Sequence, residues 1–303
     1  MQQLINLQFT MFSMIAAGVI LKRIGIIGEE GQKNLTDLVI YLILPCNIIK
    51  SFMVEFSAGI LVTFAGVLLI SIFIQLGCTM LGHILYNKIE VPQKKCLQYA
   101  TICSNAGFLG NPVAEGVFGI AGLTLASIYL IPQRIVMWSA GISVFTESPD
   151  RKTLVKRVIT HPCIIACAAG IILMVTQLKL PNFLSASIQA LSNCNTALSM
   201  MVIGMILADI HIKQMFNRKV FYYTIIRLVF IPLIVYIPCR FLHLEPIVTG
   251  VCVLLAAMPA GATTSILASK YNGDAAFATN LVIFSTLVSL LTTPLWSILL
   301  LHG

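Results

Sequence analysis

Charged residues are scarce in this chain of 303 residues. Asp, Glu, Lys and Arg make up 10% of the sequence, hydrophobic residues make up 58%, and the mean hydropathy is +0.95. Soluble globular proteins carry about 25% charged residues, so a water-soluble fold of this size would be unable to cover its surface. The composition therefore predicts an integral membrane protein divided into spans of about 20 residues each. Because backbone groups in lipid must satisfy one another, we expect an all-α fold.

Several motifs that define other classes of protein are also absent from the sequence. No CxxC pair occurs among the nine cysteines, so neither a zinc site nor a disulfide framework is predicted. The sequence has no HExxH motif, no recognisable serine–histidine pair and no P-loop, which argues against an intramembrane enzyme and a primary pump. No paired acids occur in a span, which argues against a sodium/proton antiporter. We therefore expect no catalytic residue, no metal and no cofactor, and no nucleic-acid partner despite the net charge of +8.

Hydrophobic runs between short polar connections predict transmembrane helices. The first run follows Met-Gln-Gln, without a basic region or a cleavage site, so we expect it to be a retained span. Ten spans are predicted, near residues 4–21, 36–54, 59–86, 96–118, 121–145, 161–178, 183–208, 220–241, 246–269 and 275–301.

Lysine and arginine residues gather in alternate connections between these spans. Assigning the basic connections to the cytoplasm places both termini outside the cytoplasmic membrane, although a miscounted span would break this alternation. The longest polar stretch falls midway, which predicts a first five-helix repeat (1–145), a cytoplasmic linker (146–160) and a second five-helix repeat (161–303). With an odd number of spans in each half, the two halves lie in opposite orientations, as in the inverted repeats of many secondary transporters.

The fourth predicted span is interrupted by residues that do not favour a helix. From Asn105 to Pro112, the sequence Asn-Ala-Gly-Phe-Leu-Gly-Asn-Pro places two glycines, two asparagines and a proline in the membrane. Proline removes a backbone donor and glycine loosens the backbone, so we expect the helix to unwind between about Ala106 and Asn111. Asn111 followed by Pro112 has the pattern of a helix N-cap, which predicts a restarted half-helix with free N–H groups near the membrane centre.

The ninth predicted span repeats this pattern from Met258 to Thr264. Pro259 and Gly261 are followed by the hydroxyl groups of Thr263, Thr264 and Ser265, any of which would cap a restarted helix. Two such N-termini would offer donors and positive potential to an anion, while the preceding C-termini would offer carbonyls to cations or donors. The alternative is that proline and glycine only kink these helices, but two breaks at matching positions of the two halves favour a binding site.

Three separated motifs, in order along the chain, resemble those of the auxin efflux carrier family. They are Tyr-Leu-Ile-Leu-Pro at 41–45, Asn-Ala-Gly-Phe-Leu-Gly-Asn-Pro at 105–112 and Ala-Ala-Met-Pro-Ala-Gly-Ala-Thr-Thr at 256–264. The resemblance implies the ten-helix inverted-repeat fold of the bile-acid:sodium symporters, with crossing fourth and ninth helices and an elevator-type mechanism. Plant members carry auxin, whereas bacterial members are associated with malate, malonate and similar carboxylates. This chain lacks the large central loop of the long plant carriers, which favours the bacterial type.

Arg134 in the fifth span and Arg227 in the eighth are ionisable groups inside the membrane, which makes each a candidate functional residue. A guanidinium group matches a carboxylate in two parallel hydrogen bonds, so either is a candidate anion ligand. The alternative for each is a structural bond to unwound carbonyls or to an acid such as Asp37 or Asp209.

Glu115 lies one turn into the restarted half-helix and is a candidate for coupling transport to ion movement, as a proton carrier. A solvated position at a helix end explains it as well. Asn47, Asn193 and Asn195 are neutral hydrogen-bonding residues that would line the cavity, although bonds between helices explain them nearly as well.

The leading hypothesis is a secondary-active or facilitative transporter of small organic anions, either mono- or dicarboxylates, that works by alternating access. The alternatives are an ion-coupled symporter of a larger, bile-acid-like anion and an anion channel. The expected partners are the anion and the lipid bilayer, and a homodimer is compatible with the sequence. Asn111 and the donors at both breaks are expected to hold the carboxylate, and the predicted binding residues are Asn47, Asn105, Asn111, Pro112, Arg134, Pro259, Gly261, Thr263 and Thr264.

Overall fold

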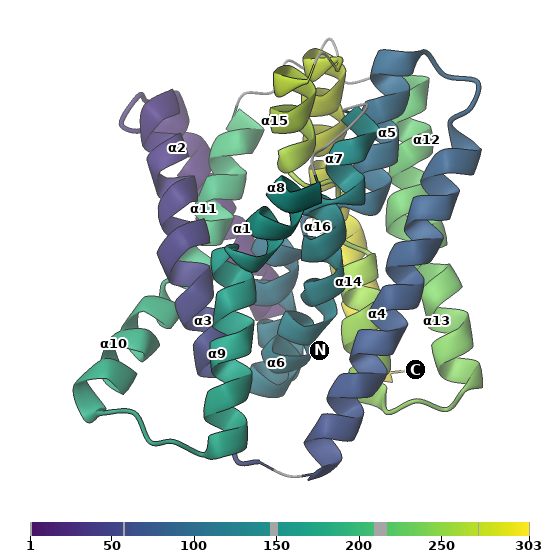
Figure 1. Cartoon of the computed structure of the whole chain (residues 1–303). Coiled ribbons are helices and arrows are strands. Elements are labelled where there is room, and N and C mark those ends of the chain that lie inside the picture. Colours follow the sequence, from purple (N-terminus) through teal and green to yellow (C-terminus); the bar gives the residue numbers. More distant parts are fainter. Residues whose placement is uncertain (1, 57, 146–150, 209–216, 272, 303) are drawn as a thin grey trace.

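The computed structural model describes residues 2–56, 58–145, 151–208, 217–271 and 273–302. Within these residues the regular structure is helical, apart from one backbone pairing between Ser104 and Ala260. Figure 1 shows the long helices standing roughly upright beside one another. The prediction of an all-helical membrane protein is confirmed, because five helices of the described chain are long and apolar enough to cross a membrane: Gly59–Leu85, Ala106–Met137, Asn182–Ala208, Arg218–Phe241 and Ala275–Leu301.

Of the remaining predicted spans, the first is a single helix of 22 residues, Gln2–Arg23, and the others are shorter helices or helices joined by a turn. Two shorter apolar helices, Pro162–Thr176 and Pro246–Ala256, lie in the second half. The helices of the first half, with π-helical turns labelled η, are α1 (Gln2–Arg23), α2 (Glu29–Leu38), η1 (Val39–Ile43), α3 (Leu44–Ser51), α4 (Ala58–Leu85), α5 (Val91–Ile102), η2 (Ala106–Gly110), α6 (Asn111–Trp138) and α7 (Ala140–Phe145).

The predicted linker 146–160 connects the two halves of the chain. Residues 146–150 lie outside the described residues, and most of the rest of the linker forms the short helix α8 (Arg151–Ile159). The helices that follow are α9 (Pro162–Thr176), α10 (Asn182–Asn193), α11 (Asn195–Ala208), α12 (Arg218–Ile225), η4 (Ile226–Phe230), α13 (Ile231–Phe241), α14 (Pro246–Ala256), α15 (Thr263–Lys270) and α16 (Ala275–His302).

Helix α6 contains a sharp turn at Gly119, where φ is 66° and ψ is −157°. A positive φ is favourable for glycine because it has no Cβ atom. The residues on the two sides of this turn run in opposite directions, since Gln133, near the end of α6, bonds back to Ser104, which precedes its start. The apolar segment Ala106–Met137 is therefore two helices that meet at Gly119 without a loop, and the predicted boundary between the fourth and fifth spans falls at the right place.

The first break lies earlier than the sequence predicted. The chain is extended at Cys103, with φ −117° and ψ 99°, and is helical again from Ala106, so the expected unwinding between Ala106 and Asn111 is wrong. The helix passes Pro112 because Ala106–Gly110 forms a π-helical turn, in which Asn111 N–H bonds to Ala106 O. In a π-helical turn the backbone bonds join residues five apart instead of four. Here this change falls just before Pro112, which has no backbone N–H to donate. Asn111 has helical φ and ψ angles and no capping bond, so its predicted N-cap role is also wrong.

The second break lies where the sequence predicted it, between the end of α14 at Ala256 and the start of α15 at Thr263. The predicted hydroxyl cap is wrong, because no side chain caps α15. Its first turn is instead closed by the backbone, from Thr264 N–H to Gly261 O at 2.9 Å and from Ser265 N–H to Ala262 O at 3.2 Å. The Ser265 hydroxyl donates to Ala262 O, whereas a capping side chain would accept from a backbone N–H group.

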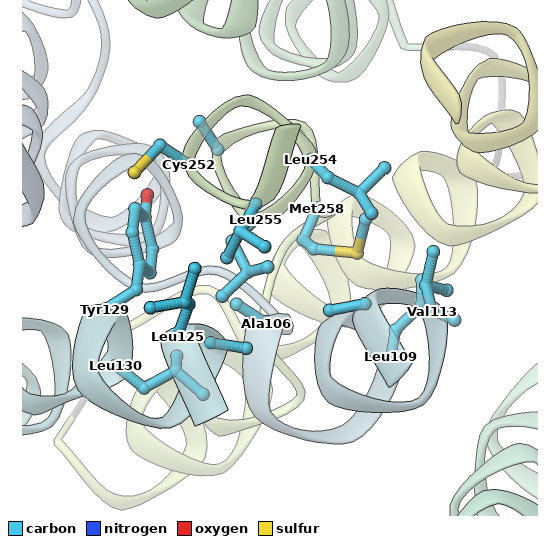
Figure 2. Close-up of a cluster of buried hydrophobic side chains, with 14 of the residues drawn as sticks. Ala106, Leu109, Val113, Leu125, Tyr129, Leu130, Cys252, Leu254, Leu255 and Met258 are labelled. Carbon is cyan, nitrogen blue, oxygen red and sulfur yellow. The ribbon is translucent and has the colours of Figure 1, made fainter. Parts of the chain in front are cut away.

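Helix α14 forms the centre of the core. All its residues from Val248 to Ala256 are buried, as expected of a helix that is apolar on every face. Figure 2 shows Leu255 and Met258 facing the side chains that follow the first break, including Ala106 and Leu109. Gly110 permits this close approach, because a Cβ atom there would lie 3.2 Å from Met258 Cγ. The two broken segments are therefore packed tightly together.

Candidate functional site

The two breaks meet backbone to backbone at a site that we call the crossing, defined as residues 103–108 and 258–263. Asn105 N–H donates to Pro259 O at 2.7 Å, and Gly261 N–H donates to Cys103 O at 3.2 Å. Ser104 and Ala260 are thereby paired as in an antiparallel β-ladder. The sequence predicted each break separately, and this pairing brings Asn105, Pro259 and Gly261 of the predicted site together.

The C-terminal carbonyl groups of α5 are all bound by protein donors. The last carbonyls of a helix have no partner inside the helix, and at this helix end the partners come from three other segments. Tyr223 Oη donates to Ala100 O at 2.9 Å, Arg227 Nη1 donates to Thr101 O at 3.0 Å, and Gln75 Nε2 donates to Ile102 O at 2.8 Å. Together with the bond from Gly261 to Cys103, these bonds give each of these carbonyl groups a protein donor.

Arg227 binds both broken helices at once. Its Nε donates to Met258 O at 2.9 Å, while its Nη1 donates to Thr101 O and lies 3.8 Å from Cys78 Sγ. The side chain is 3% exposed. A cation between the negative ends of two helix dipoles is favourably placed. Of the two hypotheses for Arg227, the bond to unwound carbonyls is therefore the one that the structure confirms.

Two further polar residues hold the crossing from neighbouring helices. Gln133 uses both ends of its amide, since Nε2 donates to Ser104 O at 2.8 Å and Oε1 accepts from Ser104 Oγ at 3.1 Å. Ser285 Oγ accepts from Ala260 N–H at 3.2 Å. Sequence reasoning did not assign these roles to Gln75, Gln133, Tyr223 or Ser285. The signal that was available is a polar side chain within an apolar run, as in Ile74-Gln75-Leu76.

We expect Gln133→Leu to destabilise the protein by about 1–3 kcal/mol, because it leaves the buried Ser104 carbonyl and hydroxyl without partners. The measurement is the thermal unfolding temperature of the purified protein in detergent. Gln189→Leu is the matched control, because Gln189 is exposed on α10. Equal unfolding temperatures for the two variants would show that Gln133 does not hold the crossing.

The donors at the N-terminal ends of the restarted helices remain available. In the described part of the chain, no carbonyl group or side chain accepts from the N–H groups of Ala106, Gly107, Phe108, Ala262 or Thr263. All but Ala106 are partly exposed, and a Cβ atom at Gly107 would meet nothing within 4 Å. Free N–H groups at helix N-termini favour an anion. The crossing thus offers donors at the restarted helices, while the last carbonyl groups of α5 are occupied.

Thr263 and Asn105 add side chains to this group of donors. Thr263 Oγ1 accepts from Tyr99 Oη at 3.2 Å, so its own hydroxyl proton is free to donate to a ligand. Asn105 is 8% exposed and lies at the break itself. Both residues belong to the predicted binding site, and both lie at the crossing.

Asn111 and Thr264 lie deeper, in the first turns of the helices that leave the crossing. Both are 0% exposed, and the polar atoms of both side chains lack a hydrogen-bond partner. Buried polar groups are rarely left unpaired without a reason. Pro112 follows Asn111 within the helix and contributes no donor.

A buried polar network connects α3, α6, α10 and α11. Asn47 Nδ2 donates to Ser192 Oγ at 3.0 Å and approaches Glu115 Oε2 at 3.4 Å, and Asn47 Oδ1 accepts from Asn195 Nδ2 at 3.3 Å. Ser199 Oγ donates to Asn195 Oδ1 at 3.3 Å. The structure thus brings together three of the predicted polar residues, Asn47, Asn195 and Glu115. Asn193 instead faces outward and binds Lys50 and Gln189.

Arg134 points toward α9. It is 6% exposed, and its Nη1 lies 3.9 Å from Cys167 Sγ. His161, just before α9 begins, accepts from Cys163 N–H through Nδ1 at 3.2 Å. Asp209, one alternative partner proposed for the arginines, lies outside the described residues.

A cavity of about 310 Å³ lies between α4 and α13, and none of the crossing residues lines it. Its lining includes Phe73, Cys78, Ile234 and Leu242, and contains no charged side chain. Organic-anion sites need convergent polar groups. The crossing, with its free donors, is therefore the better candidate site.

Comparisons with known proteins identify relatives along almost the whole chain. A family model described as "Membrane transport protein" matches residues 4–156 and 150–297. An uncharacterized transporter of Methanothermobacter thermautotrophicus is 27% identical over 297 residues, covering 95% of each chain. An uncharacterized transporter of Methanocaldococcus jannaschii is 27% identical over 304 residues, covering 95% of this chain and 96% of the relative. An Escherichia coli transporter, YfdV, is 25% identical over 200 residues, covering 63% of each chain.

Proposed function

Because the chain belongs to the membrane transport protein family, and is therefore a multi-pass membrane transporter and not an enzyme, we propose that it carries small organic anions across the cytoplasmic membrane. The proposed substrates are mono- or dicarboxylates, such as malate-like, malonate-like or auxin-like acids. The resemblance to the auxin efflux carriers agrees with the family match.

One observation carries the proposal of an anion. At the crossing, the last carbonyl groups of α5 and the Met258 carbonyl are bound by Tyr223, Arg227, Gln75 and the paired backbone, whereas N–H groups of the restarted helices are free. Arg227 adds a full positive charge next to both helix ends. A carboxylate would complete this arrangement, because it accepts from several N–H groups at once and is favoured by the positive ends of the helix dipoles.

We place the carboxylate against the partly exposed N–H groups of Gly107, Phe108, Ala262 and Thr263. The Thr263 hydroxyl and the Asn105 amide provide further donors on either side of the backbone pairing. In this proposal Pro259 and Gly261 shape the site through the backbone, because each takes part in the pairing with Cys103 and Asn105.

We further propose ten membrane crossings in two inverted repeats, with both termini outside the cytoplasm. Packing supports this arrangement, because α1 lies along α11 while α9 lies along α3. The first span of each half thus packs on the second span of the other half. The family match also falls in two segments, which together cover both halves. A homodimer remains compatible with this proposal.

The proposed mechanism is an elevator movement of one helix group against another. Within the described residues, the hydrogen bonds that hold the crossing come from α4, α5, α6, α12, η4 and α16. Helices α1, α3, α9, α10 and α11 pack mainly on one another, with smaller contacts to α6, η2 and α16. Since the anion would be bound by the first group, movement of that group against the second would carry the anion across the membrane.

Two other functions remain as alternatives, an ion-coupled symporter of a larger anion and an anion channel. Counterflow in proteoliposomes separates a carrier from a channel. We expect saturable uptake of radiolabelled dicarboxylate or monocarboxylate that rises when unlabelled substrate is loaded on the opposite side. Uptake without such trans-stimulation, with a conductance linear in voltage, would contradict the carrier and support the channel.

A further inference from the structure

Glu115 is a carboxylate without a counter-charge in the described structure. It is half-buried in α6, and its closest polar partner is the Asn47 amide at 3.4 Å. Among the described residues, the only ion pair within 4.0 Å joins Lys22 and Glu29. A carboxylate held inside the membrane without a cation is costly, which marks it as a functional group.

Asn111 lies one helical turn before Glu115, on the same face of α6. Residues four apart on a helix are neighbours, and helical side chains lean toward the N-terminus, so Glu115 leans toward Asn111. Asn111 is fully buried, and both its Oδ1 and its Nδ2 lack a partner. A buried amide without partners therefore lies one helical turn from a carboxylate whose hydrogen-bond partner is the neutral Asn47 amide.

The polar groups of α3 and α10 next to Glu115 are neutral, and Asn47 turns its Nδ2 toward the carboxylate. Asn47 Oδ1 has a second lone pair beyond the one that accepts from Asn195. Ser192 Oγ lies 3.0 Å from Asn47 Nδ2. Such oxygen atoms suit hard cations, whereas thiol and imidazole groups suit transition metals.

We propose that Glu115 and Asn111, with Asn47, bind an alkali cation such as Na⁺. The site holds one carboxylate, so its charge matches a monovalent ion. No group of three histidine, cysteine, aspartate or glutamate residues that suits a transition metal occurs in the part of the chain that the structure describes.

The cation site also gives a physical reason for coupling, and this part of the inference rests on the proposed function. The crossing lies two to three turns before Glu115 along the same chain segment. A bare carboxylate there repels an organic anion, and a bound cation removes this repulsion. Each ion is therefore expected to strengthen the binding of the other.

Lys50 is the basic side chain of α3, the helix that also carries Asn47. Its Nζ binds Asn193 Oδ1 at 3.4 Å, and it is not within ion-pair distance of Glu115. If Lys50 supplied the counter-charge, Lys50→Gln would make the protein more dependent on added cation, and the wild-type protein would show no cation dependence.

Thermal unfolding of the full chain in NaCl or choline chloride at equal ionic strength tests the site without any organic anion. We expect NaCl to raise the unfolding temperature of the wild-type protein, and Glu115→Gln and Asn111→Ala to abolish this difference. Glu55→Gln is the control, since it removes an exposed carboxylate elsewhere in the chain and is expected to keep the full response. No sodium-specific shift in the wild type, or a full shift in Glu115→Gln, would overturn the proposal.

Direct sodium binding and sodium-driven uptake complement the thermal unfolding test. If Asn111→Ala does not fold, the isosteric Glu115→Gln variant and direct binding of radioactive sodium to the wild type decide the outcome. In proteoliposomes, we expect a sodium gradient to raise carboxylate uptake by about tenfold. Sodium binding without any carboxylate uptake would support the cation site and contradict the proposed anion transport, so the two failures are distinguishable.

Discussion

Arg227→Met is expected to be the most damaging single substitution at the crossing, lowering the unfolding temperature strongly and abolishing transport. The guanidinium group donates to Met258 O and Thr101 O, which belong to the two different broken helices. Methionine fills a similar volume but leaves both carbonyl groups unsatisfied in a buried position. Each such loss costs about 1–3 kcal/mol. The loss at both carbonyl groups together is a large share of the free energy of unfolding of a typical protein.

The measurement is the unfolding temperature in detergent, followed by uptake in proteoliposomes. Arg227→Lys is expected to be intermediate, since an ammonium group lacks the planar fork that reaches both carbonyls. Arg240→Met is the matched control, because Arg240 is exposed on the neighbouring helix α13. If Arg227→Met were as stable as Arg240→Met and lost only its response to substrate, Arg227 would be an anion ligand and not a structural residue.

Gly261→Val is expected to separate the two breaks and to weaken carboxylate binding by tenfold or more, or about 1.4 kcal/mol. A Cβ atom at Gly261 would lie 3.2 Å from Cys103 O, 3.3 Å from Thr263 Oγ1 and 3.4 Å from Ser104 O. Alanine would require these atoms to shift slightly. The branched side chain of valine would push the paired backbones apart and displace the free N–H groups around them.

Ligand-induced thermal shift measures this effect, with a panel of mono- and dicarboxylates as ligands. Gly66→Val is the matched control, because a Cβ atom at Gly66 on α4 would meet nothing within 4 Å. Gly261→Ala is expected to fall between the two valine variants. An unchanged shift in folded Gly261→Val protein would place the carboxylate site away from the crossing.

Apolar runs, interrupted at Pro259 and Gly261, were sufficient to predict a helical membrane protein and the position of the second break. The first break was misplaced because Pro112 and Gly110 are the visible breakers in the sequence, whereas a π-helical turn allows the helix to pass them. The real break at Cys103–Asn105 depends on backbone pairing with Pro259 and Gly261, which are about 150 residues away. The sequence of one helix does not indicate which distant segment will pair with its backbone.

The residues that hold the crossing were also difficult to recognise. Arg227 stood out as a buried charge, but its role as a bridge between two helix ends depends on the positions of Met258 and Thr101. Gln133 lies directly before Arg134 in the sequence. Only Arg134 was predicted as a site residue, because it is ionisable. In the structure, Gln133 faces Ser104, whereas Arg134 faces Cys167 on α9. Adjacent residues on a helix point about 100° apart, so only the packing identifies which one reaches the site.

The position of a bound anion tests most directly whether a carboxylate binds at the crossing. A crystal structure of the protein with a bromine-substituted carboxylate would locate the ligand by its anomalous signal. We expect the carboxylate within hydrogen-bonding distance of the free N–H groups of Gly107, Phe108, Ala262 and Thr263. A fully occupied ligand elsewhere, beside Arg134 or in the apolar cavity between α4 and α13, with none at the crossing, would contradict the account.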